Sequence, residues 1–402
     1  MNKDTKAMRV RLAAVIVVFA LTLTLARVSL GAGAAVHTIM AYEAVGMVTD
    51  KQLQALLQEN LSSLVIGAVL PDGGYASDSL YGEMSHWPPF HSAYFDHVES
   101  QCGRASAGRS AWRSERCQKL IAHMMGMIAH GVADESYDLL MDARSQYLDA
   151  VDSDSPLIAR DLLVDKYALV DYGYALELFP TAVSPLEDLL QVFRDMGHNL
   201  TREELMNGQQ TMIAAAALER LVTNVYSDIQ DSAIYPWLRN NYRDQPGGVR
   251  FTAGALANLW TFYWKRLQGR HAPAMPTLFP GPGYALERST RDPWGRIHFL
   301  SDRPLDKDSL IAHKAVAIGR NTIVLVPDNA IVITDAHTGK EIQGELFYEE
   351  EGYMVSFTPW SWSSTSSTVY RVTARARLKD RWQQQVFPGG RSWLISVRGQ
   401  GE

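Results

Sequence analysis

Two side chains of metal-binding type stand four residues apart in the apolar stretch IAHMMGMIAHGVADESYDLL, residues 121–140. If this stretch is a helix, His130 and Asp134 lie on one face and can bind the same ion. Neutral imidazole nitrogen and carboxylate oxygen are ligands that zinc prefers. Because an unpaired charge in an apolar interior is costly, these side chains require partners from elsewhere in the chain.

Three further motifs offer such partners: His37 in AVHTIMAYEA, Asp72 in GAVLPDGGY and His86 in MSHWPPF. Each has an ordinary structural alternative, because a lone histidine on an apolar helix is usually a core residue and PDGG is a strong turn signal. His123 lies seven residues before His130, about 10 Å along a helix axis, which is too far to share an ion. We therefore expect His123 to pack or to support a ligand.

These motifs fall within a region of helical periodicity, from about Ala35 to Leu267. Its helix start signals include TDKQ at Thr49, SPLE at Ser184 and TREE at Thr201. The segment FTAGALANLWTFYWKRL is apolar nearly all round, which places it at the centre of a bundle. The sequence thus predicts one all-α domain that positions the candidate ligands.

The composition changes after this region. GRHAPAMPTLFPGPGYALERSTRDPWG is rich in Pro and Gly, which predicts a linker that is not helical. Beyond it, NTIVLV, AIVITD, GELFYEEEGYMVSFTP, TVYRVTARAR and RSWLISV have the period of two that is typical of strands in a β-sandwich. We expect a signal segment 1–31, an all-α domain 32–268, a linker 269–298 and a β-sandwich 299–400. The predicted fold class is a two-domain protein, one domain α-helical and the other all-β.

The bulk composition limits the function. The chain has 402 residues, of which 47% are hydrophobic and 20% charged, with a formal net charge of −6. This acidic balance argues against a nucleic-acid binder with a broad basic surface. The sequence has no G-x-S-x-G elbow, phosphate loop or dinucleotide fingerprint.

The N-terminus predicts export. Basic residues between positions 3 and 11 precede the apolar run LAAVIVVFALTLTL and the small-residue stretch VSLGAGAA. This order is typical of a cleaved secretory signal, and an uncleaved membrane anchor is the alternative. We expect the protein to be secreted or to lie in the periplasm or at the cell surface. In an exported protein, Cys102 and Cys117 most simply form a disulfide.

In order and spacing, the motifs GAVLPDGGY, SHWPPFHSAYFDHV and LIAHMMGMIAHGVADESYDLL resemble the zinc-dependent phospholipase C family. Within that family they are most similar to the N-terminal catalytic domain of glycosylphosphatidylinositol-specific phospholipase D. The resemblance spans roughly residues 32–165, and TAGALANLWTFY is similar to the last helix of the family. It implies an all-α domain with a polynuclear zinc site.

The resemblance also implies which residues bind which ion. One zinc would be bound by Asp72, His86, His130 and Asp134. Asp134 would bridge to a second zinc, which His37 and the free α-amine of the mature N-terminus complete.

The third zinc is where the sequence departs from the family. Asp138 stands where the family has a histidine shortly after the bridging aspartate, and Leu157 and Asp161 stand at a later histidine and acid. Leucine cannot bind a metal. The site therefore holds two or three zinc ions, draws in another acid such as Asp165, or binds a different ion. Because ligands of the family are missing, a domain that has lost catalytic activity is a further alternative.

The C-terminal segments GRNTIVLVPDNAIVITDAHTGKEIQG and YMVSFTPWSWSSTSSTVYRVTARARLKD resemble the bacterial Ig-like domain of surface-layer and secreted proteins. Such modules usually position or attach another domain. Trp360 and Trp362 either enter a lipid interface, where tryptophan is favoured, or cap the end of the sandwich.

Together these inferences predict an exported zinc phosphodiesterase acting on a phospholipid or glycosyl-phosphoinositide, with type C or type D cleavage left open. Zinc would polarise the phosphoryl oxygens and lower the pKa of water for in-line attack, and Asp72 would be ligand and proton acceptor. Trp87 and Phe90, close to His86, are candidate pocket walls. We expect contact with a membrane surface and no nucleic acid, and the oligomeric state is left open. The alternatives are a zinc nuclease of the same fold and a non-catalytic surface adhesin or scaffold.

Overall fold

The computed structural model describes residues 33–108, 110–142, 145, 149, 160–173, 177–226, 235–245, 247–270, 284–287, 297–300, 305–318, 322–349, 354–359 and 368–398. The predicted signal segment, Leu157, Trp360 and Trp362 lie outside these residues, as does most of the predicted linker.

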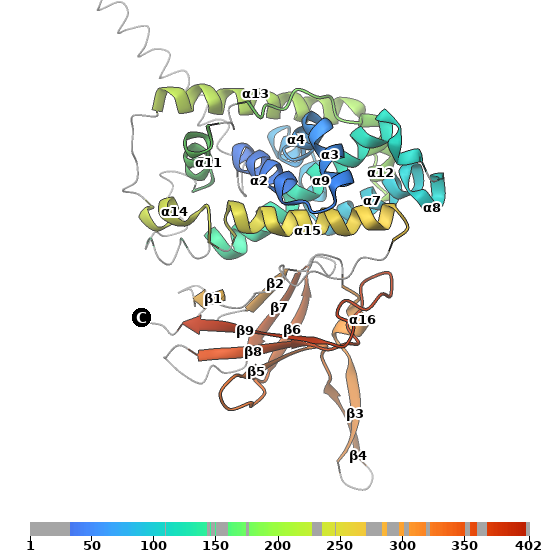
Figure 1. Ribbon diagram of the computed structural model, residues 1–402, viewed down its shortest axis with the longest axis vertical. Helices are drawn as coiled ribbons and strands as arrows, with labels where there is room; N and C mark the ends of the chain where they lie inside the picture. The colour runs from blue at the N-terminus through green and yellow to red at the C-terminus, as the bar shows by residue number, and fades with distance from the viewer. Residues whose placement is uncertain are drawn as a thin grey trace, which may run out of the picture.

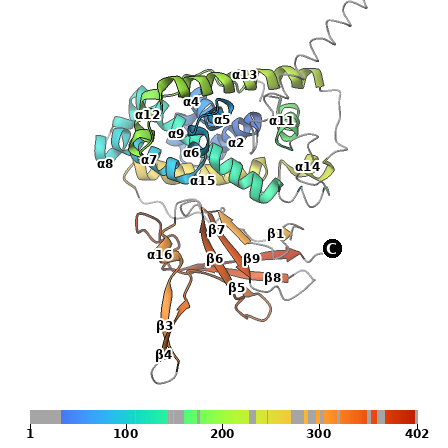
Figure 2. The same cartoon turned by 180° about the vertical axis from the view of Figure 1, so that it is seen from behind.

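Helices form the described chain up to residue 267. They are α2 (Ala34–Met47), α3 (Lys51–Glu59), α4 (Leu61–Gly67), α5 (Leu70–Ala76), α6 (Tyr81–His86), α7 (Pro88–Cys102), α8 (Arg104–Ala107), η1 (Ala111–Arg113), α9 (Glu115–Ser136), η2 (Tyr137–Asp142), α11 (Arg160–Asp171), α12 (Leu186–Asp195), α13 (Arg202–Tyr226), α14 (Pro236–Asn241) and α15 (Val249–Leu267). In Figures 1 and 2, α13 and α15 run along opposite sides of the helical region, with α2, α4 and α9 between them. Trp260 and Trp264 of α15 are buried, as the apolar sequence of this segment predicts.

The three predicted helix start signals differ in how they cap their helices. Thr201 and Glu204 form the reciprocal capping box before α13. In TDKQ the capping side chain is Asp50 rather than Thr49, because the carboxylate reaches two backbone N–H groups of α3. Ser184 does not cap α12, whose first residue follows a proline.

A close crossing joins α4 to α9, the helix of the IAHMMGMIAHGVADES sequence. A Cβ atom on Gly67 would lie 2.3 Å from the carbonyl oxygen of His123, and one on Gly126 would lie 2.2 Å from that of Leu64. The two backbones can approach this closely because neither glycine has a side chain. The end of α4 is therefore fixed against the middle of α9, next to the candidate ligands.

The C-terminal part of the chain contains the strands. They are β1 (Tyr284–Glu287), β2 (Ile297–Leu300), β3 (His313–Ile318), β4 (Thr322–Pro327), β5 (Ile331–Asp335), β6 (Gly344–Glu349), β7 (Met354–Pro359), β8 (Thr368–Ala374) and β9 (Arg391–Arg398), with the short helix α16 (Lys307–Leu310). The sheet orders are β1-β9-β8-β5, β2-β7-β6 and β3-β4, and all described pairs except β1-β9 are antiparallel. The protein is thus α-rich with a β-containing C-terminal part.

The boundary of the predicted linker differs from the structure. β1 lies within residues 269–298, and β2 begins at Ile297. Tyr284 of β1 pairs with Ile395 of β9, so the segment acquires strand structure from a partner more than a hundred residues away. Local Pro and Gly content excluded helix there but could not reveal this pairing.

Trp382 connects the two parts of the chain. Its ring lies 5.5 Å from that of Phe262 on α15 and 6.0 Å from that of Phe95 on α7. The guanidinium of Arg266 lies 3.8 Å from the Trp382 ring centroid, within cation–π range. A tryptophan from the β-containing part is thus packed on the helical core.

In the described part of the chain, no single helix is both long and apolar enough to cross a bilayer. The helices Lys51–Glu59 and Leu61–Ala76 meet the length and composition criteria only as a pair, bent by 81°.

Candidate metal centre

Four helices bring five of the predicted ligands together. His37 comes from α2, Asp72 from α5, His86 from the last position of α6, and His130 and Asp134 from α9. All five side chains are buried. Two overlapping triads, His37–Asp72–His130 and His86–His130–Asp134, have ligand atoms within 4.8 Å of one another. The separated motifs therefore converge on one site.

Four of the candidate ligand atoms lie within 3.5 Å of one another across each histidine–histidine and histidine–aspartate pair. The Nε2 atom of His86 lies 2.9 Å from Nε2 of His130, 3.4 Å from Oδ1 of Asp72 and 3.3 Å from Oδ2 of Asp134. His130 Nε2 lies 3.5 Å from Asp72 Oδ1 and 3.3 Å from Asp134 Oδ2. Four atoms placed tetrahedrally about 2.05 Å from an ion would be about 3.3 Å apart. The four histidine–aspartate distances are close to this length, and the distance between the two nitrogens is shorter.

Backbone carbonyls fix the orientation of two imidazoles. Nδ1 of His130 donates to the carbonyl oxygen of Ala68 at 2.8 Å, and Nδ1 of His86 donates to that of Gly82 at 2.6 Å. Each Nε2 then carries a lone pair, and two lone pairs face each other at 2.9 Å. A cation must lie between the nitrogens, either a proton, as the raised pKa of His130 favours, or a metal ion. These residues can therefore hold a metal ion.

His37 extends the cluster from the side of α2. Its Nε2 lies 3.1 Å from Oδ1 of Asp134, and its ring stacks on that of His130 with centroids 3.9 Å apart. Nδ1 of His37 is buried and has no hydrogen-bond partner among the described residues. The two oxygens of Asp134 thus face different histidines, as a carboxylate that bridges two ions would.

The charges of the cluster are strongly coupled. Burial alone would raise the pKa of Asp72, but the charges and hydrogen bonds of His130 and His86 outweigh it and lower the pKa. Burial is likewise outweighed by His37 and His130 at Asp134, whose pKa is also lowered. Burial would lower the pKa of His130, but the two aspartates raise it to about 10. Both carboxylates are ionised at neutral pH, so the site attracts positive charge.

Asp165, which the sequence offered as an alternative metal ligand, faces the start of α2. Its carboxylate accepts hydrogen bonds from the backbone N–H groups of Val36 at 2.8 Å and Ala35 at 3.3 Å. A Cβ atom on Gly33 would lie 1.9 Å from Asp165 Oδ2, so a glycine is required there. Asp165 therefore fixes the helix that carries His37.

Asp138, a predicted ligand of a third ion, is in neither of the two triads. The side chain of Asp138 is exposed, and it lies in the π-helical turn η2 that follows α9. Asp161 lies in α11, but its side chain, like Leu157, falls outside the described residues. The Asp138 side chain is thus exposed although Asp134, four residues earlier, is buried.

Sequence reasoning missed a polar rim beside the cluster. The Glu83 carboxylate accepts hydrogen bonds from the hydroxyl of Tyr75 at 2.6 Å and from Nε1 of Trp87 at 2.8 Å. The Tyr75 ring lies 4.8 Å from that of His86. Glu83 and Trp87 are four residues apart in YGEMSHW, and this spacing was the available signal. Phe90, in contrast, is fully buried in the core, so the prediction that it lines a pocket was wrong.

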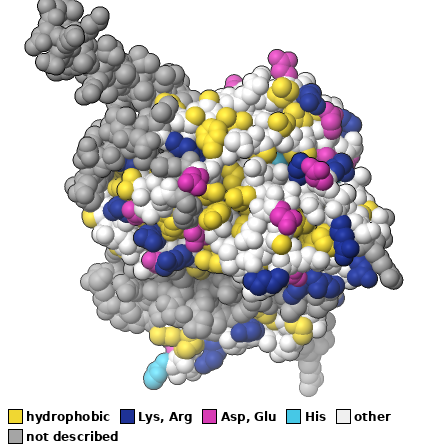
Figure 3. Space-filling model, turned by 45° about the horizontal axis from the view of Figure 1, so that its top comes forward, with side chains coloured by type: hydrophobic (Ala, Val, Ile, Leu, Met, Phe, Trp, Pro, Cys, Tyr) yellow, Lys and Arg dark blue, Asp and Glu magenta, His cyan; other side chains and the backbone are white. Residues whose placement is uncertain are grey.

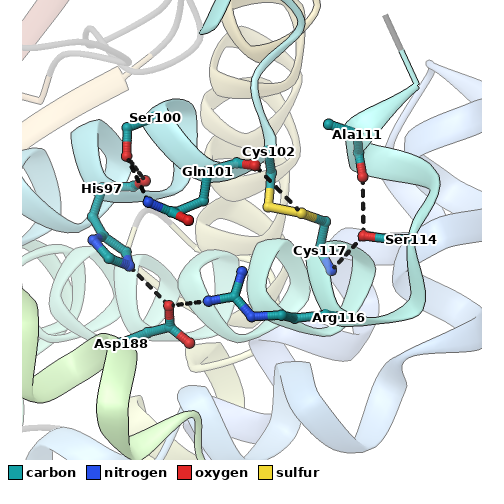
Figure 4. Close-up of a disulfide and its surroundings, with 9 residues drawn as sticks. All are labelled: His97, Ser100, Gln101, Cys102, Ala111, Ser114, Arg116, Cys117 and Asp188. Atoms are coloured by element: carbon teal, nitrogen blue, oxygen red, sulfur yellow. Dashed lines mark hydrogen bonds and ion pairs between the residues drawn. A yellow bond between two sulfur atoms is a disulfide. The ribbon is translucent and has the colours of Figure 1, made fainter. Parts of the chain in front are cut away.

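Two other histidines, His123 and His97, have structural partners. His123 Nδ1 lies 3.0 Å from the hydroxyl of Tyr94, away from the ligands. His97 and Arg116 both contact Asp188 beside the Cys102–Cys117 disulfide (Figure 4). The predicted disulfide is thus confirmed, and its Cα atoms are 5.6 Å apart.

Comparisons with known proteins do not identify the chain. No family model and no curated protein match it. Solved structures that match include domains 1–6 of the surface layer protein SbsC, with 10% sequence identity and a TM-score of 0.21. This match covers 86% of this chain and 46% of that chain. The N-terminal part of the bacterial S-layer protein SbsC matches with 12% sequence identity and a TM-score of 0.22. That match covers 77% of this chain and 79% of the other. This chain therefore spans less than half of the first structure, and such low TM-scores support no conclusion about function.

Proposed function

We propose that this protein is an exported zinc-dependent phosphodiesterase that hydrolyses phospholipids by type C or type D cleavage. The observation that carries the proposal is the convergence of His86, His130, Asp72 and Asp134, whose histidine nitrogens lie 3.3 to 3.5 Å from the aspartate oxygens. Two imidazole nitrogens and two carboxylate oxygens at this spacing suit zinc. His37 and the second oxygen of Asp134 would serve an additional ion, which gives at least two zinc ions.

The chemistry follows from the charge of the site. Bound zinc would polarise a phosphoryl oxygen and lower the pKa of a water molecule for attack on phosphorus. Asp72 is ionised at neutral pH and is the proposed proton acceptor, although its lowered pKa makes it a weak base. Tyr75 and Trp87, held by Glu83, form the wall that a substrate headgroup would meet.

The proposal extends to the whole chain. A disulfide supports an exported location, because disulfides persist in oxidising compartments. We interpret the C-terminal part as an Ig-like sandwich beside the phospholipase C-like domain. Buried Ile333 and Val372 of one sheet share an apolar cluster with Val355 of another sheet, which supports this interpretation.

The test combines metal analysis with hydrolysis. Zinc content and chelator-sensitive hydrolysis of phosphatidylcholine, phosphatidylinositol and single-stranded nucleic acid should be measured on the mature protein. We expect bound zinc, phospholipid hydrolysis that chelator abolishes, and loss of both in His130→Ala. His198→Ala is the matched control, because His198 is exposed. Zinc without any hydrolysis would favour the scaffold, and cleavage of nucleic acid alone would favour the nuclease.

A further inference from the structure

Three exposed aliphatic side chains lie on or beside helices α6 and α13. Leu80 is 74% exposed and Val183 is 73% exposed, while Met206 is 38% exposed. Side chains of this kind are individually common on surfaces, but a cluster beside a buried site indicates an interaction surface. Figure 3 shows hydrophobic side chains gathered in a band on the face that carries α13, with charged side chains at its sides.

Contacts to α13 bring the segments that carry Leu80 and Val183 next to the stretch of α13 that carries Met206. Tyr81, the residue after Leu80, has its hydroxyl 1.7 Å from where a Cβ on Gly208 of α13 would lie. Met206 is three residues before Gln209, so these two occupy neighbouring positions on α13. The backbone N–H of Ser184, next to Val183, donates to the side chain of Gln209 at 2.9 Å. Leu80 and Val183 thus flank the same short stretch of α13 from two other segments.

The same surface is continuous with the rim. Leu80 precedes Glu83 by three residues at the start of α6, so the two lie on one face of that helix. Glu83 accepts hydrogen bonds from the polar ends of Tyr75 and Trp87, which are amphipathic side chains with an apolar ring body. Tyrosine and tryptophan with a satisfied polar end are favoured where apolar and aqueous media meet.

Charged side chains near these three residues indicate which kind of membrane the surface can bind. Glu187 forms an ion pair with Arg202, and Glu204 accepts hydrogen bonds from Thr201. With Glu83, this set has three carboxylates and one guanidinium, so it offers no attraction to an anionic membrane. A neutral, zwitterionic bilayer is therefore the better partner.

We propose that Leu80, Val183 and Met206 form a docking surface that inserts into the interface of a zwitterionic phospholipid bilayer and presents the rim to its headgroups. This inference rests on the proposed function, because the buried metal centre can reach a lipid phosphate only if the rim contacts the membrane. Burial of exposed apolar side chains provides the binding free energy.

The test measures binding and catalysis separately. Surface plasmon resonance with brief injections over phosphatidylcholine vesicles gives the Kd of the zinc-loaded protein. The double variant Leu80→Asp/Val183→Asp should bind at least tenfold more weakly. Leu325→Asp is the matched control, because Leu325 is 70% exposed on β4 and is expected to leave the Kd unchanged. The ratio of vesicle hydrolysis to hydrolysis of a soluble short-chain phosphodiester should fall at least tenfold in the double variant.

Several results would overturn the docking surface. The double variant could bind vesicles with the same Kd as the wild type. Leu325→Asp could weaken vesicle binding as much as the double variant does. Anionic lipid in the vesicles could tighten binding tenfold. Concentration-dependent dimerisation that the double variant abolishes, without a change in vesicle binding, would assign the surface to a second copy. If no phosphodiester is hydrolysed in either form, the proposed function fails, while the vesicle Kd values still decide the docking surface.

Discussion

His123 should make folding of this protein sensitive to acid. Burial, opposed weakly by the charge of Asp188, lowers the pKa of His123 to about 3. The side chain is therefore neutral in the folded protein across the mildly acidic range. In the unfolded chain its pKa is about 6.5, so unfolding takes up a proton between these two values. The contribution to stability is fully present above pH 6.5 and is lost as the pH falls toward 3.

The magnitude follows from the two pKa values. Between pH 7 and pH 5, the proton uptake of His123 should reduce the free energy of unfolding by about 1.9 kcal/mol. The side chain is 1% exposed, so solvent screening reduces this value little. Asn at this position retains a polar atom for the hydroxyl of Tyr94 but does not titrate. His123→Asn should therefore lose about 1.9 kcal/mol less stability than the wild type over this pH range.

Urea unfolding of the metal-free protein at both pH values measures this difference. Other titrating groups, including the metal ligands, contribute equally to both proteins and cancel. His198→Asn serves as the exposed control and should change the pH dependence by less than about 0.5 kcal/mol. An identical pH dependence in the wild type and His123→Asn would refute the reasoning.

Three further outcomes test the packing of the fold. Replacing Cys102 and Cys117 by alanine opens a loop with a sequence separation of 15 and should cost about 3 kcal/mol in urea unfolding, and a loss below about 1 kcal/mol would contradict it. Gly67→Ala should destabilise by about 1–3 kcal/mol because the added Cβ meets backbone, whereas Gly46→Ala, with nothing within 4 Å, should not. Trp382→Ala should cost about 1–3 kcal/mol through lost packing and cation–π contact, and unchanged thermal unfolding would show that the contact with α15 contributes nothing.

The ligand cluster was accessible from the sequence because its residues have specific spacing. His130 and Asp134 share a helical face by periodicity alone. Their convergence with His37, Asp72 and His86 was predicted only from the order of the motifs, since local patterns do not say which helices cross. The close approach at Gly67, which brings the carbonyl of Ala68 to His130, depends on tertiary packing and left no periodic signal.

Other features depended on structure that local patterns cannot specify. Asp138 was expected among the ligands from its place shortly after Asp134, but its side chain is exposed in the π-helical turn η2. Phe90 was expected at a pocket because it is close to His86 in sequence, but it packs in the core against Phe193, with ring centroids 4.8 Å apart. Adjacency in sequence did not determine which face of α7 points inward.

Zinc K-edge X-ray absorption of the purified mature protein tests the metal centre most directly. Both cysteines are in the disulfide, so the spectrum should contain nitrogen and oxygen ligands at about 2.0–2.1 Å, imidazole scattering and no sulfur. His130→Ala should lose this signal, and His198→Ala should retain it. A folded protein that binds no zinc, or that gives an unchanged spectrum in His130→Ala, would contradict the assignment of this cluster as a metal centre.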